Sequence, residues 1–78
     1  MSQYIITVYT HYGQPKMITQ IGKQPKVFYN SLSIDEILTF IESHNELITV
    51  VASSDLYDTI KNRLEKYYNF ELARSNIS

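Results

Sequence analysis

The chain has 78 residues, no cysteine and a net charge of −1, from seven Lys and Arg residues against eight Asp and Glu residues. This length predicts one domain over residues 1–78, and the lack of cysteine excludes disulfides, thiolate metal sites and cysteine nucleophiles. The near-neutral charge makes electrostatic steering toward nucleic acid weak. A small domain without disulfides is typical of a reducing compartment, so we expect a protein of the cytoplasm, in its own cell or in a host cell. No apolar run approaches the ~18 residues of a membrane span, so we expect no membrane contact.

The first 30 residues predict an antiparallel meander of three strands. Residues 3–12 are dense in β-branched and aromatic side chains, which favours a strand. Turn-forming segments begin at Gly13 and Gly22, and they predict further strands over 16–22 and 26–30. In the first strand, the alternate positions expected to face the core are Tyr4, Ile6, Val8, Thr10 and Tyr12.

The middle of the chain predicts a helix followed by a strand. Ser33 and Glu36 fit a capping box, so we expect a helix over 34–44. Its apolar positions recur at helical spacing and predict one buried stripe, made of Ile34, Ile37, Leu38 and Ile41. The run over 47–52 is almost wholly apolar and β-branched, which is typical of a strand that is covered on both faces.

The last part of the chain predicts a second helix over 55–68, with Ser54 or Asp55 as its N-cap. Residues 70–73 alternate weakly, and a short last strand there stays an open alternative. The fold class that follows is α+β, a small two-layer sandwich. It has a three-stranded antiparallel meander and then α-β-α, with the helices packed on one face of a mixed sheet.

The sequence lacks the motifs of common catalytic and cofactor sites. Its histidines, His11 and His44, do not have the spacing of a metal-ligand pattern. Its glycines lie in expected hairpin turns rather than in a phosphate-binding loop. Ser53 and Ser54 stand between a strand and a helix, but the glycines of a nucleophile elbow are missing. We therefore expect a protein that is not an enzyme and that has no metal and no cofactor.

The tyrosine content favours protein binding. The chain has seven tyrosines, and a core of this size cannot bury seven phenols and also satisfy their hydroxyls. Exposed tyrosine is enriched at protein interfaces. The outer face of the first helix is acidic, and it adds a second surface that could contact a basic partner. The predicted protein-binding residues are Asp35, Glu36, Glu42, Glu46, Tyr57, Tyr67 and Tyr68.

These features suggest a small binding module that occupies the surface of another protein, whose identity the sequence does not give. Its character would suit an inhibitor of a host defence protein, encoded by a virus or a mobile element. One alternative is a nucleic-acid-binding regulator that uses the meander, less favoured than a protein partner. Another is a self-assembling structural protein that pairs through an edge strand, and a homodimer would stabilise so small a domain. The alternative nucleic-acid face is made of Tyr9, His11, Lys16, Lys26 and Tyr29.

Overall fold

The computed structural model describes residues 3–30, 33–44, 46–67 and 69–75. In these ranges the elements are β1 (Tyr4–His11), β2 (Gln14–Ile21), β3 (Val27–Tyr29), α1 (Ile34–Glu42), β4 (Ile48–Ala52), α2 (Ser54–Leu64) and β5 (Phe70–Arg74). The described strands form a mixed five-stranded sheet in the order β3-β2-β1-β4-β5. The α+β class predicted from the sequence is therefore confirmed. β5 occupies the segment where the last strand had been left open.

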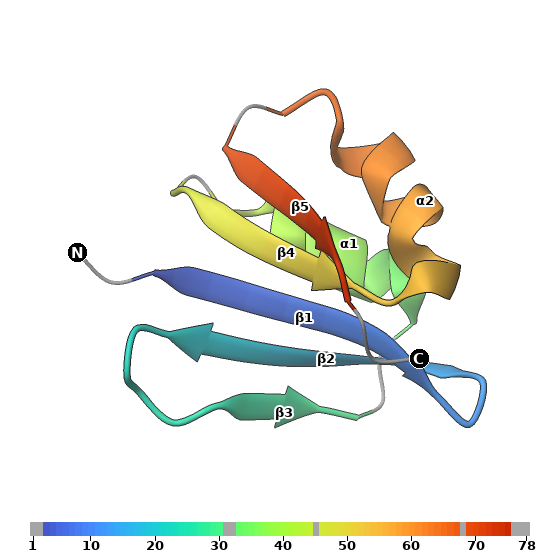
Figure 1. Cartoon of the computed structure of the whole chain (residues 1–78), viewed down its shortest axis with the longest axis horizontal. Helices are drawn as coiled ribbons and strands as arrows, with labels where there is room; N and C mark the ends of the chain where they lie inside the picture. Colours follow the sequence, from blue (N-terminus) through green and yellow to red (C-terminus); the bar gives the residue numbers. More distant parts are fainter. Residues whose placement is uncertain (1–2, 31–32, 45, 68, 76–78) are drawn as a thin grey trace.

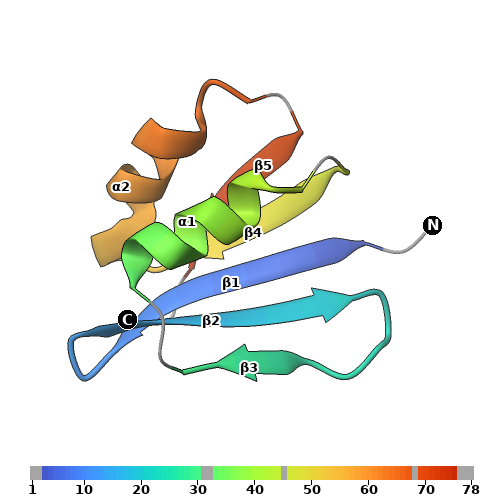
Figure 2. The same ribbon diagram turned by 180° about the vertical axis from the view of Figure 1, so that it is seen from behind.

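The sheet has an antiparallel half and a parallel half. β1 pairs antiparallel with β2, and β2 pairs antiparallel with β3. β4 runs parallel to both of its neighbours, β1 and β5. Parallel neighbours need a crossover connection, and α2 supplies the one between β4 and β5. Figures 1 and 2 show α1 behind the strands in one view and in front of them in the other.

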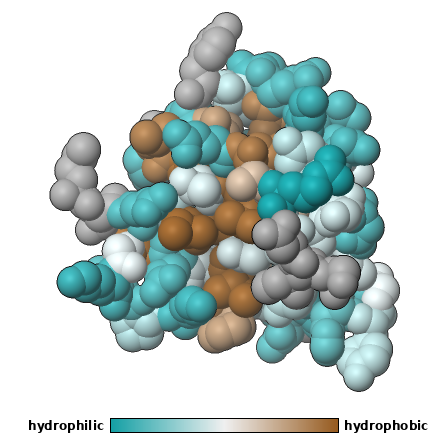
Figure 3. Space-filling model, in the orientation of Figure 1, coloured by the Kyte–Doolittle hydropathy of each residue, from teal (hydrophilic) through white to brown (hydrophobic). Residues whose placement is uncertain are grey.

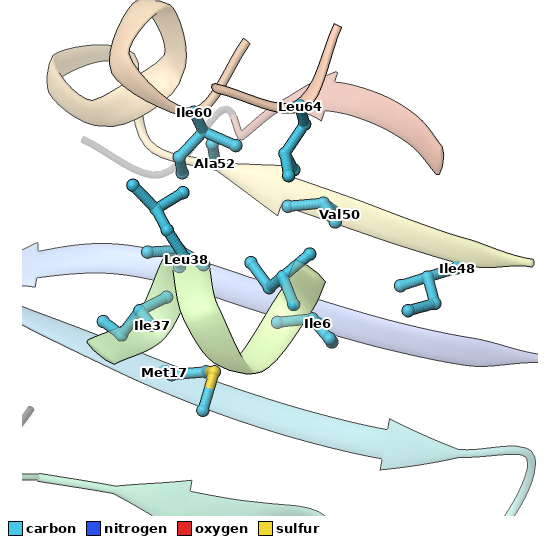
Figure 4. Packing of buried hydrophobic residues seen from close by; sticks show 11 residues of the cluster. Ile6, Met17, Ile37, Leu38, Ile48, Val50, Ala52, Ile60 and Leu64 are labelled. Carbon is cyan, nitrogen blue, oxygen red and sulfur yellow. The ribbon is translucent and has the colours of Figure 1, made fainter. Parts of the chain in front are cut away.

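Both helices pack on the same side of the sheet, which we call the covered face. We call the opposite side the open face. The core lies between the covered face and the helices, and Figure 4 shows side chains from both layers pointing toward one another. Strand alternation and helical spacing each put one set of side chains into this layer. The buried apolar residues are Ile6, Val8, Met17, Ile37, Leu38, Ile41, Ile48, Val50, Ala52, Ile60 and Leu64.

The start of α1 is where the sequence predicts it. The Glu36 backbone N–H donates to Ser33 Oγ at 3.1 Å, and the Ser33 N–H donates to Glu36 Oε1 at 2.9 Å, so the predicted capping box is confirmed. The helix ends at Glu42, two residues before the expected end at 44. Ser43 is the C-cap, and its hydroxyl donates to the Phe40 carbonyl at 2.7 Å. The same carbonyl also accepts from the Ser43 N–H at 3.3 Å and lies 2.8 Å from His44 Nδ1, so several groups close the last turn.

The start of α2 differs from the prediction. The N-cap is Ser53, one residue before the two candidates, and its hydroxyl donates to Asp55 Oδ1 at 2.6 Å instead of capping a backbone N–H. The hydroxyl of Thr10, in β1, also donates to the Asp55 carboxylate. These two bonds hold the pKa of Asp55 below its ordinary value, with the Ser53 bond contributing most. Asp55 thus joins the first turn of α2 to the central strand. The helix ends at Leu64, well before the expected 68.

The turn between β1 and β2 corrects one expected core residue. Tyr12 was expected to face the core, but its side chain is 91% exposed. Tyr12 and Gly13 form a two-residue hairpin loop, because His11 pairs with Gln14. Both have positive φ, 51° and 73°, as a type I′ turn requires. The tight loop ends β1 at His11 and starts β2 at Gln14, earlier than the predicted 16.

Candidate functional site

Glu42 has a structural role that its position on α1 did not reveal. Its carboxylate faces Arg63 of α2, with Nε at 3.1 Å from Oε2 and Nη2 at 3.0 Å from Oε1. The Tyr67 hydroxyl donates to Oε2 at 3.1 Å. The Arg63 hydrogen bond is the main cause that lowers the pKa of Glu42, and the bond to Glu42 is the main cause that raises the pKa of Tyr67. The sequence placed Glu42 and Tyr67 on a contact surface, whereas here they join α1 to α2 and the segment after it.

The other predicted contact residues lie apart from this cluster. Tyr57 is half-buried against the core, and the Arg74 guanidinium lies 4.3 Å from the centroid of its ring. Glu46 is exposed near the start of β4. Tyr68 lies outside the described residues. Asp35 and Glu36, by contrast, lie together in one hollow.

That hollow is a groove between α1 and the β2–β3 half of the covered face. Its volume is about 470 Å³, and its lining residues are Met17, Tyr29, Asp35, Glu36, Thr39 and Phe40. Figure 2 shows the elements on either side of it: α1 crosses in front of the strands, and β3 lies at the edge of the sheet. Tyr29 on β3 and Phe40 on α1 meet across the groove, with ring centroids 5.9 Å apart.

The groove has an apolar floor and an acidic rim. Met17 is buried beneath it, and the rings of Tyr29 and Phe40 are half-buried in its walls. On the rim, the Asp35 side chain is 86% exposed, and its nearest cation, Arg63, lies 3.9 Å away. Glu36 is exposed while it caps α1. The lining residues that the structure describes include no Lys or Arg, so the groove suits an apolar side chain beside a positive charge.

A second hollow lies at the start of β1 and β4 and has a volume of about 550 Å³. It also contains acidic residues, Glu46 and Glu71, together with Leu47, which is 67% exposed. Its walls carry the amide of Gln3 and the hydroxyl of Thr49, which lie 3.4 Å apart in a hydrogen bond. The lining of the first groove is apolar in larger proportion and carries two aromatic rings, so we take that groove as the candidate site.

Within the alternative nucleic-acid face, Tyr29 does not share a surface with Tyr9 and Lys16. Tyr9 and Lys16 are register partners on the open face. Tyr29 pairs with the buried Met17, so its side chain lies on the covered face. The Lys16 ammonium donates to the Asn30 carbonyl at 2.8 Å. The exposed residues His11 and Lys26 lie at the end of β1 and just before β3.

Sequence reasoning named Tyr29 only for the alternative nucleic-acid face, and it missed Phe40 as a site residue. Phe40 lies beside the buried stripe of α1, and this offset was the available signal that it covers an edge of the core. Its proximity to Tyr29 could not be read from the chain, because the contact depends on how α1 crosses the sheet.

Within the described ranges, no three His, Asp or Glu side chains come together as a metal site would require. No helix in the described part of the chain has the length and apolar character needed to cross a bilayer. No family model matches the sequence, and no similar protein was found among curated proteins or solved structures.

Proposed function

We propose that this protein is a non-enzymatic binding module whose groove takes a short basic and apolar segment of another protein. By holding that segment, the module occludes it from other contacts. The observation that carries this proposal is the pairing of aromatic walls, Tyr29 and Phe40, with an acidic rim, Asp35 and Glu36, in one groove of about 470 Å³.

The two halves of the groove have different energetic roles. An apolar side chain that enters the groove covers the exposed parts of the aromatic rings, and burial of apolar area supplies most of the affinity. The exposed carboxylate of Asp35 contributes little to affinity, since exposed ion pairs are worth less than about 1 kcal/mol. It raises the association rate and selects basic segments over acidic ones.

Peptide selection tests this proposal. A random peptide library displayed on phage should yield sequences in which Arg or Lys stands beside Leu, Phe or Trp. The substitution Asp35→Lys replaces a weak attraction with a repulsion and should weaken the best peptide about fivefold, measured by fluorescence anisotropy. Asp58→Lys is the matched control, because Asp58 is exposed on α2 and does not line the groove. It should change the affinity by less than about twofold.

Two results would refute the proposal that the groove binds this peptide segment. One is a selection without a basic and apolar pattern. The other is an equal loss of affinity for Asp35→Lys and Asp58→Lys, which would mean that net charge, and not the groove, attracts the peptide.

A further inference from the structure

An uncharged row of residues crosses the whole open face. The register places Phe28 opposite Ile18, Ile18 opposite Thr7, Thr7 opposite Val51, and Val51 opposite Ala73. The row therefore runs from one edge strand to the other. Figure 3, which looks onto the open face, shows hydrophobic residues gathered over the middle of the strands with hydrophilic residues around them.

The core does not explain this row. The helices and the buried cluster lie on the covered face, while Phe28 remains 62% exposed on the other side. The run 47–52 predicts a strand covered on both faces, yet the described residues cover one face of β4 only. Ile48 and Val50 are fully buried there, and Val51 is half-exposed. A sheet face meant for water normally carries polar side chains at these positions. Something outside the described chain is therefore expected to cover the open face.

We propose that a second copy of this chain covers it, with the two open faces packed against each other around a two-fold axis parallel to the strands. Two-fold symmetry requires a self-complementary surface. This axis places β1 against β1, β2 against β4, and β3 against β5. Ile18 then faces Val51 of the partner subunit, and the large Phe28 faces the small Ala73 of the partner subunit.

The charges at the rim of the open face agree with this axis. Glu71 lies on β5 in the row next to Val51, on the open side, because it pairs with Thr49. Lys26 is exposed just before β3, at the opposite edge of the sheet. The proposed axis brings Glu71 near Lys26 of the partner subunit. Because the axis is two-fold, the same contact forms a second time with the two subunits exchanged. An axis perpendicular to the strands would instead place β3 on β3, with the Phe28 rings competing for one space and Glu71 without a cation.

The size of the face sets the strength of the dimer. Five strands about 4.8 Å apart and about five residues long give a face of roughly 20 by 17 Å. Two such faces have a combined area of roughly 700 Å², less than the ~1,000 Å² of a stable interface. We expect association in the micromolar range rather than a permanent dimer. The groove lies on the covered face, so the dimer leaves both grooves open.

Analytical ultracentrifugation from about 1 to about 500 µM tests the proposal. The weight-average mass should rise from the monomer value of 9.1 kDa toward twice that value. Val51→Lys should keep the chain monomeric across this range, because it buries a charge in the interface. Thr59→Lys adds the same charge on the exposed side of α2 and should dimerise like the parent. Circular dichroism at the lowest concentration shows whether each variant is folded.

A charge swap tests the orientation. Glu71→Lys and Lys26→Glu should each weaken the dimer several-fold, and the double variant should recover to within about twofold of the parent. If the double variant did not recover the dimer affinity of the parent, the proposed two-fold axis parallel to the strands would be wrong.

A chain that stays monomeric at every concentration would overturn the dimer itself. If the Val51→Lys variant still dimerised like the parent, the proposal that the dimer forms through the open face would be wrong. Pairing through an edge strand would then be indicated. Neither result bears on peptide binding, because Asp35 and the groove are scored in a separate assay.

Discussion

At the scale of single residues, Glu42 is the clearest case of a side chain whose role depends on distant partners. Its position on α1 suggested a free acidic surface, but its carboxylate accepts from Arg63 and Tyr67, which come 21 and 25 residues later. Only 16% of its side chain is exposed. A carboxylate this covered is stable as an anion because the guanidinium and the phenol hydroxyl replace water around it.

The pKa of Glu42 makes a specific prediction about pH. Because its pKa is lower when folded than its ordinary value of 4.5, ionised Glu42 stabilises the fold above about pH 4.5, and this contribution is lost as the pH falls through the folded pKa. We expect Glu42→Gln to lower the thermal midpoint by roughly 2–5 °C near pH 7 and by much less in acid.

Thermal unfolding of parent and variant between about pH 2 and pH 7 measures this difference. Asp58→Asn, at an exposed position of α2, serves as the control for loss of one negative charge. Parallel pH profiles for the parent and Glu42→Gln would contradict the role given to Glu42.

At the scale of elements, α1 shows which boundaries are local. Its first residue could be predicted because the capping box is made by Ser33 and Glu36, three residues apart. Its last residue is set by bonds that are also local, from the Ser43 hydroxyl to the Phe40 carbonyl and from the His44 N–H to the Ile41 carbonyl, but no distinctive sequence motif announces them. The start of α2 shows a non-local limit, because Thr10 of β1 bonds the Asp55 carboxylate.

The capping box predicts the stability of α1. Ser33→Ala removes the acceptor for the Glu36 N–H, and we expect a loss of about 1 kcal/mol in the free energy of unfolding. Ser54→Ala replaces an exposed serine inside α2 and should change this free energy by less than about 0.5 kcal/mol. Urea denaturation followed by circular dichroism measures both. Equal effects for the two serines would show that the cap contributes nothing.

At the scale of the whole molecule, neighbouring residues of the central strand β1 differ in how deeply the fold buries them. Ile6 is fully buried in the core, whereas Ile5 is half-buried on the open face. A domain of 78 residues has a total stability of about 4–12 kcal/mol, so one core cavity is a large fraction of it.

We expect Ile6→Ala to cost about 3 kcal/mol in the free energy of unfolding, because the lost contacts leave a cavity that the packed sheet and helices cannot fill. Ile5→Ala should cost no more than about 1.5 kcal/mol when measured at a concentration where the chain is monomeric. Denaturation curves of both variants give the comparison. Similar losses at the two positions would mean that the open face is packed within a single chain.

The sequence alone was sufficient for features that arise from local backbone geometry. Alternation in β1, helical spacing in α1 and the capping box identified the α+β class and most of the buried stripe. The position of Tyr12 was predicted wrongly, because the alternating strand pattern of the sequence continues through it. In the structure Tyr12 has the positive φ of a type I′ turn, and its side chain therefore does not lie on the covered face.

Only the tertiary structure decided the candidate surfaces. Tyr29 and Phe40 form a groove because α1 crosses the sheet beside an edge strand, and Glu42 meets Arg63 because α1 and α2 pack side by side. The run 47–52 predicted two covered faces, and the structure alone showed which of them is still open. The physical reason is the same throughout: periodicity is set by the backbone within a few residues, whereas proximity between distant residues is set by packing.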